Sequence, residues 1–129
     1  MRLSRRTFTA IAVNASALTA CSPFMGEPKM YGLIVHMTAA PGQRDALVSI
    51  LLGSTSNMPG CLSYVLAQDP TNPDAIWITE VWDSQASHKA SLSLPAVKDA
   101  ILRAKPLIAG FDKQTETVPV GGRGLRASG

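Results

Sequence analysis

The sequence predicts an α+β fold in which strands and helices follow the order β-α-β-β-α-β. Three observations support this fold class. Four segments alternate along the chain with a period of two, apolar residues recur at helical spacing between them, and Pro, Gly and Asn separate the segments. The 129 residues are 46% hydrophobic and 16% charged, which suits one packed domain rather than a disordered chain.

The first strand and helix come from residues 30–60. Met30–Thr38 alternates between two faces that are both largely apolar, as in a strand. Pro41-Gly42 is expected to open a helix with the proline in its first turn, and Met58-Pro59-Gly60 ends it. The inner face of this helix should carry Leu47, Ile50, Leu51 and Ser54.

Two further strands form a predicted hairpin. Cys61–Asp69 and Ala75–Trp82 are joined by a segment dense in turn residues, Pro70–Asp74. The third strand is apolar on both faces except for Thr79 and Glu80, so both of its faces need cover. Glu80 has two interpretations: a salt-bridge partner at a dimer interface, which we favour, or a carboxylate with a perturbed pKa.

Two short helices and a last strand complete the pattern. Asp83 or Ser84 caps a helix that runs to Leu92, and Ser93 caps a second helix with Pro95 in its first turn. Helical spacing places Val97, Ala100, Ile101 and Ala104 on the inner face, and Lys105-Pro106 and Gly110 end the helix. Phe111–Pro119 is the last strand, with Asp112, Gln114 and Glu116 on one face, and residues 120–129 form a flexible tail.

This order of elements is the split βαβ arrangement called ferredoxin-like, an antiparallel sheet with its helices on one face. The helices leave the other face bare, although the first and third strands carry apolar residues there as well. A large exposed apolar face usually marks an interface. We therefore expect a homodimer in which two sheets pack face to face about a two-fold axis.

The first twenty residues have the features of an export signal peptide. A segment with Arg2, Arg5 and Arg6 precedes a short, mildly apolar stretch, and Ser4–Phe8 resembles the twin-arginine signal of bacteria. Leu18–Cys21 resembles a lipobox, which predicts lipidation of Cys21 and a spacer over residues 21–29. The protein would then be a lipoprotein of the bacterial cell envelope, in contact with a membrane only through that lipid. If Met30 is the true start, the protein is instead cytoplasmic.

Charge and composition exclude several classes of partner. The three arginines of the leader account for the whole formal charge of +3, so the domain has no basic stripe and no nucleic-acid partner is expected. Two histidines and the remaining thiol, Cys61, are too scattered to form a metal site. Cys61 is more typical of a small buried residue than of a catalytic thiol. No glycine-rich phosphate loop follows a strand.

The run Pro59–Leu62, the run Ile78–Asp83 and the following Ala86, His88 and Ser91 resemble the antibiotic biosynthesis monooxygenase family, most closely its quinol-monooxygenase-like members. The resemblance covers about residues 30–119. It implies a dimeric α/β barrel. It also implies, as in characterised members, oxidation of hydroquinone-like aromatic molecules by O₂ without a metal or flavin cofactor.

The resemblance carries over to individual positions of this chain. The strand tryptophan of the family matches Trp82, and His88 stands where a polyketide-tailoring relative has a substrate-holding tyrosine. That relative has an asparagine at the position of Ile78, and many relatives have a histidine at the position of Ser91. Haem degradation, which some proteins of this fold perform, is disfavoured because Met30–Thr38 contains no asparagine and His88 comes too early.

Cofactor-free oxidation requires a base that removes a proton from the substrate in a dry cavity. Histidine suits this task near neutral pH, which makes His88 and His36 the catalytic candidates. Trp82, Ser91 and Tyr64 are candidates for contacting a small aromatic substrate. The expected function is a cofactor-independent monooxygenase or quinol oxidase. The alternatives are a non-catalytic ligand-binding protein or a dimerisation module on the same fold.

Overall fold

The computed structural model describes residues 29–125. Four strands, three helices and one 3₁₀ turn follow each other along this part of the chain. Their bounds are β1 Tyr31–Ala39, α1 Arg44–Gly53, β2 Cys61–Gln68, β3 Ala75–Trp82, α2 Gln85–Ser91, α3 Pro95–Ala104, η1 Lys105–Leu107 and β4 Ile108–Thr117. The predicted α+β, ferredoxin-like βαββαβ fold is confirmed, with the second helical segment divided into α2 and α3.

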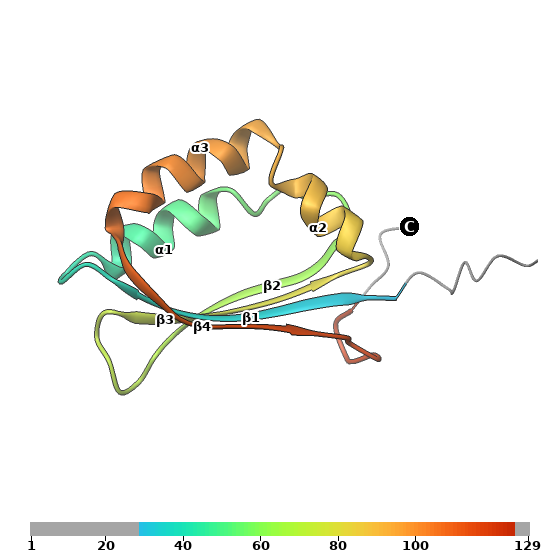
Figure 1. Ribbon diagram of the computed structural model, residues 1–129, viewed down its shortest axis with the longest axis horizontal. Coiled ribbons are helices and arrows are strands. Elements are labelled where there is room, and N and C mark those ends of the chain that lie inside the picture. The colour runs from blue at the N-terminus through green and yellow to red at the C-terminus, as the bar shows by residue number, and fades with distance from the viewer. Residues whose placement is uncertain (1–28, 126–129) are drawn as a thin grey trace, which may run out of the picture.

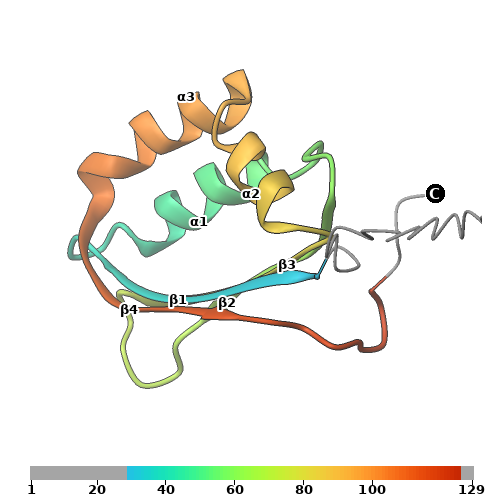
Figure 2. The ribbon, with the colours of Figure 1, turned by 45° about the vertical axis from the view of Figure 1, so that its right-hand side comes forward.

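The sheet is antiparallel throughout, with the strand order β2-β3-β1-β4. The two central strands, β1 and β3, contain most of the fully buried strand residues, whereas β2 and β4 at the edges are half-buried or exposed. All three helices lie over one face of the sheet, which curves beneath them (Figures 1 and 2). Within residues 29–125 no helix covers the opposite face, which is called the open face below.

The core lies between the helices and the sheet. Alternate residues of β1 turn to the helix side and are almost fully buried: Leu33, Val35, Met37 and Ala39. Leu47 of α1 and Ile76 of β3 are completely buried beside them, and Trp82 is 1% exposed. The helix side of the sheet is thus the main site of apolar burial, which stabilises the fold by the hydrophobic effect.

Gly60, in the predicted helix-ending segment Met58-Pro59-Gly60, is needed for the turn that leads into β2. Gly60 has a φ of +84°, a conformation that residues with a Cβ rarely adopt. A Cβ at this position would also lie 2.5 Å from the Ser87 side chain and 2.7 Å from Asp83. The turn before β2 therefore packs closely against the start of α2, and it holds α2 at the end of β3.

Several predicted boundaries are wrong in detail. Pro41 and Gly42 form a turn before α1 and are not part of it. Ser84 does cap α2 by accepting from the Ser87 N–H, whereas α3 begins after Leu94 without a side-chain cap, so Ser93 is not its cap. Because η1 turns the chain sharply, β4 begins at Ile108 and Gly110 lies inside the strand.

The prediction that three residues of the last strand share one face is also wrong. Gln114 and Glu116 pair with Val35 and Leu33 and so lie on the helix side. A register shift falls between the partners of His36 and Met37, and Asp112 lies at this bulge. The Asp112 side chain therefore reaches the open face, where it accepts a hydrogen bond from Thr38 at 2.7 Å.

The predicted export signal of residues 1–20, the lipidation site Cys21 and nearly all of the predicted spacer lie outside the described residues. The predicted tail is described only as far as residue 125, and Val120 within it is 96% exposed. Among the helices of residues 29–125, none has both the length and the apolar character that crossing a membrane requires.

Candidate functional site

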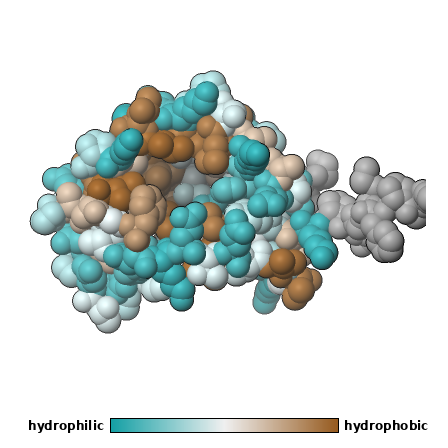
Figure 3. Space-filling view, in the orientation of Figure 1, coloured by the Kyte–Doolittle hydropathy of each residue, from teal (hydrophilic) through white to brown (hydrophobic). Residues whose placement is uncertain are grey.

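A cavity of about 730 Å³ lies between the helices and the sheet. Its floor is the helix side of the sheet, and its walls come from α1, α2, α3 and the start of β4. Its lining is mostly apolar. Leu92, Ile101 and Phe111 line it while remaining 45%, 45% and 61% exposed, so they rim its mouth. Figure 3 shows hydrophobic side chains around a hollow on this side of the molecule.

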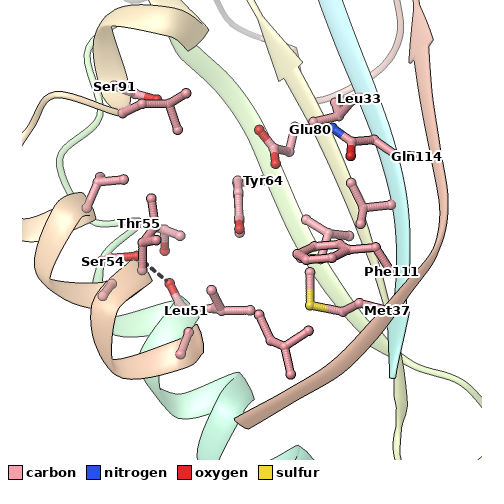
Figure 4. Close-up of a pocket in the computed structure, with 18 of the residues that line it drawn as sticks. Leu33, Met37, Leu51, Ser54, Thr55, Tyr64, Glu80, Ser91, Phe111 and Gln114 are labelled. Carbon is pink, nitrogen blue, oxygen red and sulfur yellow. Dashed lines mark hydrogen bonds between the residues drawn. The ribbon is translucent and has the colours of Figure 1, made fainter. Parts of the chain in front are cut away.

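A small set of polar side chains interrupts the apolar lining. Glu80 and Tyr64 project from neighbouring strands of the sheet into the space beneath the helices (Figure 4). These two residues are direct partners across the β2–β3 pair. Trp82 and His88 lie beside Glu80 at the same end of the cavity.

Glu80, Trp82 and His88 form a connected group, which we call the polar triad. The indole N–H of Trp82 donates to Oε2 of Glu80 at 2.8 Å. The same oxygen lies 3.7 Å from Nε2 of His88, which is within ion-pair distance but beyond a hydrogen bond. The Trp82 and His88 rings meet edge to face with centroids 5.4 Å apart.

Burial governs the electrostatics of this group. Glu80 is 8% exposed, and removal from water raises the pKa of its carboxyl above the ordinary value. The Trp82 hydrogen bond and the nearby His88 oppose this rise. Burial, with a contribution from Glu80, also raises the pKa of Tyr64, so that side chain keeps its phenolic proton. The cavity therefore contains the Glu80 carboxyl group next to the hydroxyl donor of Tyr64.

His88 connects the cavity to the surface. Besides lining the cavity, it lines a smaller surface hollow formed mainly by α2 and by the side chains of Tyr31, Gln114 and Glu116. The Tyr31 ring packs on His88 in a tilted arrangement, with a centroid distance of 5.0 Å and an interplanar angle of 38°. The Tyr31 hydroxyl donates to Glu116 at 2.9 Å, and burial together with this carboxylate raises the Tyr31 pKa to about 12. His88 is thus held between two aromatic rings, with the cavity on one side and the hollow on the other.

His36 is placed elsewhere. Its side chain lies on the open face of the sheet, where Nε2 is 2.8 Å from Asp69 and Nδ1 is 3.0 Å from Asp112. Its ring packs on Trp77 at a centroid distance of 4.4 Å. The expectation that His36 lines the cavity of Trp82 and His88 is therefore wrong, because strand alternation turns its side chain away from the helices.

Asp69 is the centre of this second cluster, on the open face. Besides contacting His36, it accepts hydrogen bonds from the Thr71 hydroxyl and backbone N–H and from the Trp77 indole. These donors hold the pKa of its carboxyl far below the ordinary range. Arg44 of α1 donates to the backbone carbonyls of Asp69 and Asn72. The cluster ties the loop between β2 and β3 to β1, β4 and α1, which is a structural task.

The other predicted site residues do reach the cavity. Trp82, Tyr64 and Ser91 all line it together with His88. Ser91 is 4% exposed, and its hydroxyl donates to the backbone carbonyl of His88 at 2.6 Å. Of the two interpretations of Glu80, the favoured one on the bare face of the sheet is wrong because the side chain faces the helices, and the raised pKa agrees with the second. The spacing of two between Glu80 and Trp82 was the signal, since strand residues two apart share a face.

Metal-ligating side chains do not gather at this site. Across residues 29–125 there is no group of three His, Cys, Asp or Glu side chains that is arranged to hold a metal ion. Cys61 is half-buried at the start of β2, where its thiol contacts the backbone carbonyl of Ser63. Burial and the nearby Glu80 raise the pKa of this thiol, which keeps it protonated and weakly nucleophilic.

Comparison with known proteins gives a consistent result. Residues 30–103 match the family described as antibiotic biosynthesis monooxygenase. A crystal structure from Chloroflexus aurantiacus J-10-fl, described as a candidate member of this family, is 69% identical to the chain. Its TM-score is 0.74, and the match covers 75% of this chain and 99% of that one. No protein with curated annotation matches the chain.

More distant structures share the fold. A candidate antibiotic biosynthesis monooxygenase from Deinococcus radiodurans is 26% identical, with a TM-score of 0.60 and coverage of 71% of this chain and 94% of that one. The protein PA3566 from Pseudomonas aeruginosa is 22% identical, with a TM-score of 0.65 and coverage of 74% and 98%. Across this range of identity the matched part of the chain accounts for 94–99% of each relative's length.

Proposed function

Because the chain belongs to the antibiotic biosynthesis monooxygenase family, we propose that it is a cofactor-independent monooxygenase that oxidises a small phenolic or hydroquinone-like molecule with O₂. The cavity between the helices and the sheet carries this proposal. Its volume of about 730 Å³ falls within the range of roughly 300–1,000 Å³ that is typical of small-molecule sites. Apolar walls with a few convergent polar groups suit an aromatic ring that bears a hydroxyl.

The reaction begins with proton removal. An aromatic hydroxyl is a poor electron donor until it loses its proton, and His88 is the base at the cavity wall. The anion then transfers one electron to O₂, which gives a substrate radical and superoxide. These recombine at a ring carbon that bears hydrogen, and the peroxide loses water to give the quinone. One O₂ is consumed for each quinone and each water formed.

In this reaction the protein positions the aromatic substrate and keeps water away from it. Trp82 and Tyr64 offer flat surfaces against which an aromatic ring can pack. The apolar lining excludes water, so the developing anion is held beside the His88 ring that has taken its proton rather than by solvent. Leu92, Ile101 and Phe111 at the mouth provide an apolar entry for the ring.

Oxygen consumption by chelator-treated protein tests the function. We expect O₂ uptake above the spontaneous rate with at least one member of a panel of hydroquinones and naphthols, with quinone and O₂ in equal amounts. Heat-unfolded protein is the control for uncatalysed oxidation, and added catalase reveals any hydrogen peroxide. Tight binding of panel members without any uptake would contradict an enzyme and favour the non-catalytic ligand-binding protein.

We also propose that two copies pack their open faces together. Ile34, Val65, Trp77 and Val81 bring apolar surface to this face, and Val65 is 52% exposed. In sedimentation equilibrium the protein is expected to have the mass of a dimer, and Val65→Lys should weaken the association because it places a charge in the contact. Leu102→Lys, which changes a 72% exposed residue of α3, is the matched control. A monomeric wild-type protein at micromolar concentration would contradict the face-to-face pair.

A further inference from the structure

We propose that Glu80 is the hydroxyl-binding residue of the cavity: its oxygen Oε1 accepts the hydrogen bond of the substrate hydroxyl, and the carboxylate passes the proton on to His88. This inference deepens the proposed function and rests on it for the identity of the reaction. The hydrogen bond between Oε1 and the ligand hydroxyl requires only that the cavity binds an aromatic ring with a hydroxyl. This part of the proposal can therefore be tested without turnover.

The two oxygens of Glu80 have different surroundings. Oε2 accepts from Trp82 at 2.8 Å and faces His88 at 3.7 Å, so it is the occupied oxygen. Oε1 makes no hydrogen bond to any residue in the described range, and it is not sealed away from the cavity. The Glu80 side chain projects into the cavity space (Figure 4), and because Oε2 is taken up by Trp82, Oε1 is the oxygen that a ligand can reach.

Oε1 of Glu80 is a hydrogen-bond acceptor without a protein donor in an otherwise apolar cavity, and this favours ligands that bring a donor. A buried carboxylate oxygen without a donor is unfavourable, and a hydrogen bond to a charged group is about twice as strong as one between neutral groups. The ligand that best satisfies Oε1 therefore brings a donor at the edge of an apolar ring. Tyr64, the direct cross-strand partner of Glu80, can act as a second donor or can stack on that ring.

His88 is placed to accept the proton from Glu80 and to release it to solvent. The proton leaves the substrate oxygen and bonds to Oε1 of Glu80. Because Oε2 is the oxygen that faces His88, the carboxyl group must then release Trp82 and turn, after which its O–H bond breaks as the N–H bond to Nε2 of His88 forms. The gap of 3.7 Å between the carboxyl oxygen and Nε2 is one that a small rotation of the His88 ring closes. His88 also lines the surface hollow, where solvent can take the proton. With the proton on either residue, the cavity never contains two uncompensated negative charges.

The pKa of Glu80 depends on the titratable groups that surround it. His88 approaches from α2, while Tyr64 and Cys61 approach from β2 and Tyr31 lies on β1. Lys105 also lines the cavity, at the end nearest η1. Both phenols and the thiol have raised pKa values and are neutral near pH 7, so none of the three adds a negative charge beside Glu80.

A matched pair of ligands tests the assignment. Hydroquinone monomethyl ether has one hydroxyl and hydroquinone dimethyl ether has none, and their shapes are otherwise alike. Calorimetry under nitrogen should show the full-length protein binding the monomethyl ether about ten- to a hundredfold more tightly. In Glu80→Gln, which keeps the shape and an acceptor for Trp82, the preference should fall to within about threefold, since a neutral acceptor is weaker. Asp99→Asn, an equivalent change on exposed α3, should keep the preference.

The outcomes separate this inference from the proposed function. Equal affinity for both ethers in the wild-type protein, or loss of the preference in Tyr64→Phe but not in Glu80→Gln, would overturn the role of Glu80. Preference without O₂ uptake would leave that role intact and remove the oxygenase.

If circular dichroism shows that Glu80→Gln is misfolded, the wild-type protein decides the question. A hydroxyl that donates to the carboxylate favours its charged form, so affinity for the monomethyl ether should rise as the pH rises through the Glu80 pKa. Affinity for the dimethyl ether should fall over the same range, because that ligand only removes the carboxylate from water. Parallel pH profiles for the two ethers would overturn the proposal.

Discussion

His88→Ala is expected to lower the rate of O₂ uptake by about 10²–10⁴-fold, the contribution typical of a positioned acid or base. The physical reason is that the ring is the only imidazole that lines the cavity within residues 29–125, and no neighbouring group replaces it between Glu80 and the surface hollow. The measurement is initial O₂ uptake at saturating substrate, with the oligomeric state and the circular dichroism spectrum of the variant checked in parallel.

Two companion measurements separate a chemical role from a structural one. Free imidazole should partly restore the rate of His88→Ala, because the vacated space opens to the surface hollow and admits a small ring. His36→Gln should change stability rather than rate, because its ring contacts Asp69 and Asp112 on the open face. A folded His88→Ala protein with the wild-type rate would remove His88 from the reaction.

Trp82→Ala is expected to decrease the free energy of unfolding by about 3–5 kcal/mol, as is typical when a buried tryptophan is truncated. Trp82 is 1% exposed and lies on a central strand, between Tyr31 of β1 and Cys61 of β2. Its loss would enlarge the existing cavity and would remove the only N–H within the described residues that bonds to Glu80. Guanidinium-induced unfolding followed by circular dichroism gives the value.

Trp82→Phe separates the contribution of packing from that of the hydrogen bond to Glu80. The phenyl ring keeps most of the packing, but Oε2 of Glu80 loses its donor, and we expect a decrease of about 1–3 kcal/mol from the unsatisfied carboxylate. Because the tryptophan hydrogen bond lowers the Glu80 pKa, its removal should raise that pKa further. A decrease below about 1 kcal/mol in Trp82→Ala would show that the side chain is not part of the core.

Much of the fold followed from periodicity and turn residues alone. The third strand, Ala75–Trp82, was predicted with the bounds that the structure has, and Ser84 caps the helix that follows it. Both signals are local, since alternation and capping depend only on neighbours in the chain. The start of β4 was missed because η1 and the bulge at Asp112 depend on packing against β1 and leave no local pattern.

The site was harder to predict for a specific reason. Alternation shows which residues share a face, but a strand that is apolar on both faces does not reveal which face the helices cover. Glu80 and His36 were each assigned to the wrong side for this reason, while Trp82, Tyr64, His88 and Ser91 were brought together as expected. The chemical roles of these residues remain predictions that the variants above test.

The order of the sheet leaves two strands at its edges, β2 and β4, and the two edges are unequally protected. On β4 the bulge and the charges of Asp112, Lys113 and Glu116 oppose the approach of another strand. The β2 segment, Cys61–Gln68, contains no charged residue, and Val65 in it is 52% exposed. Intermolecular strand addition, and with it aggregation during folding or overexpression, is therefore concentrated on the β2 edge.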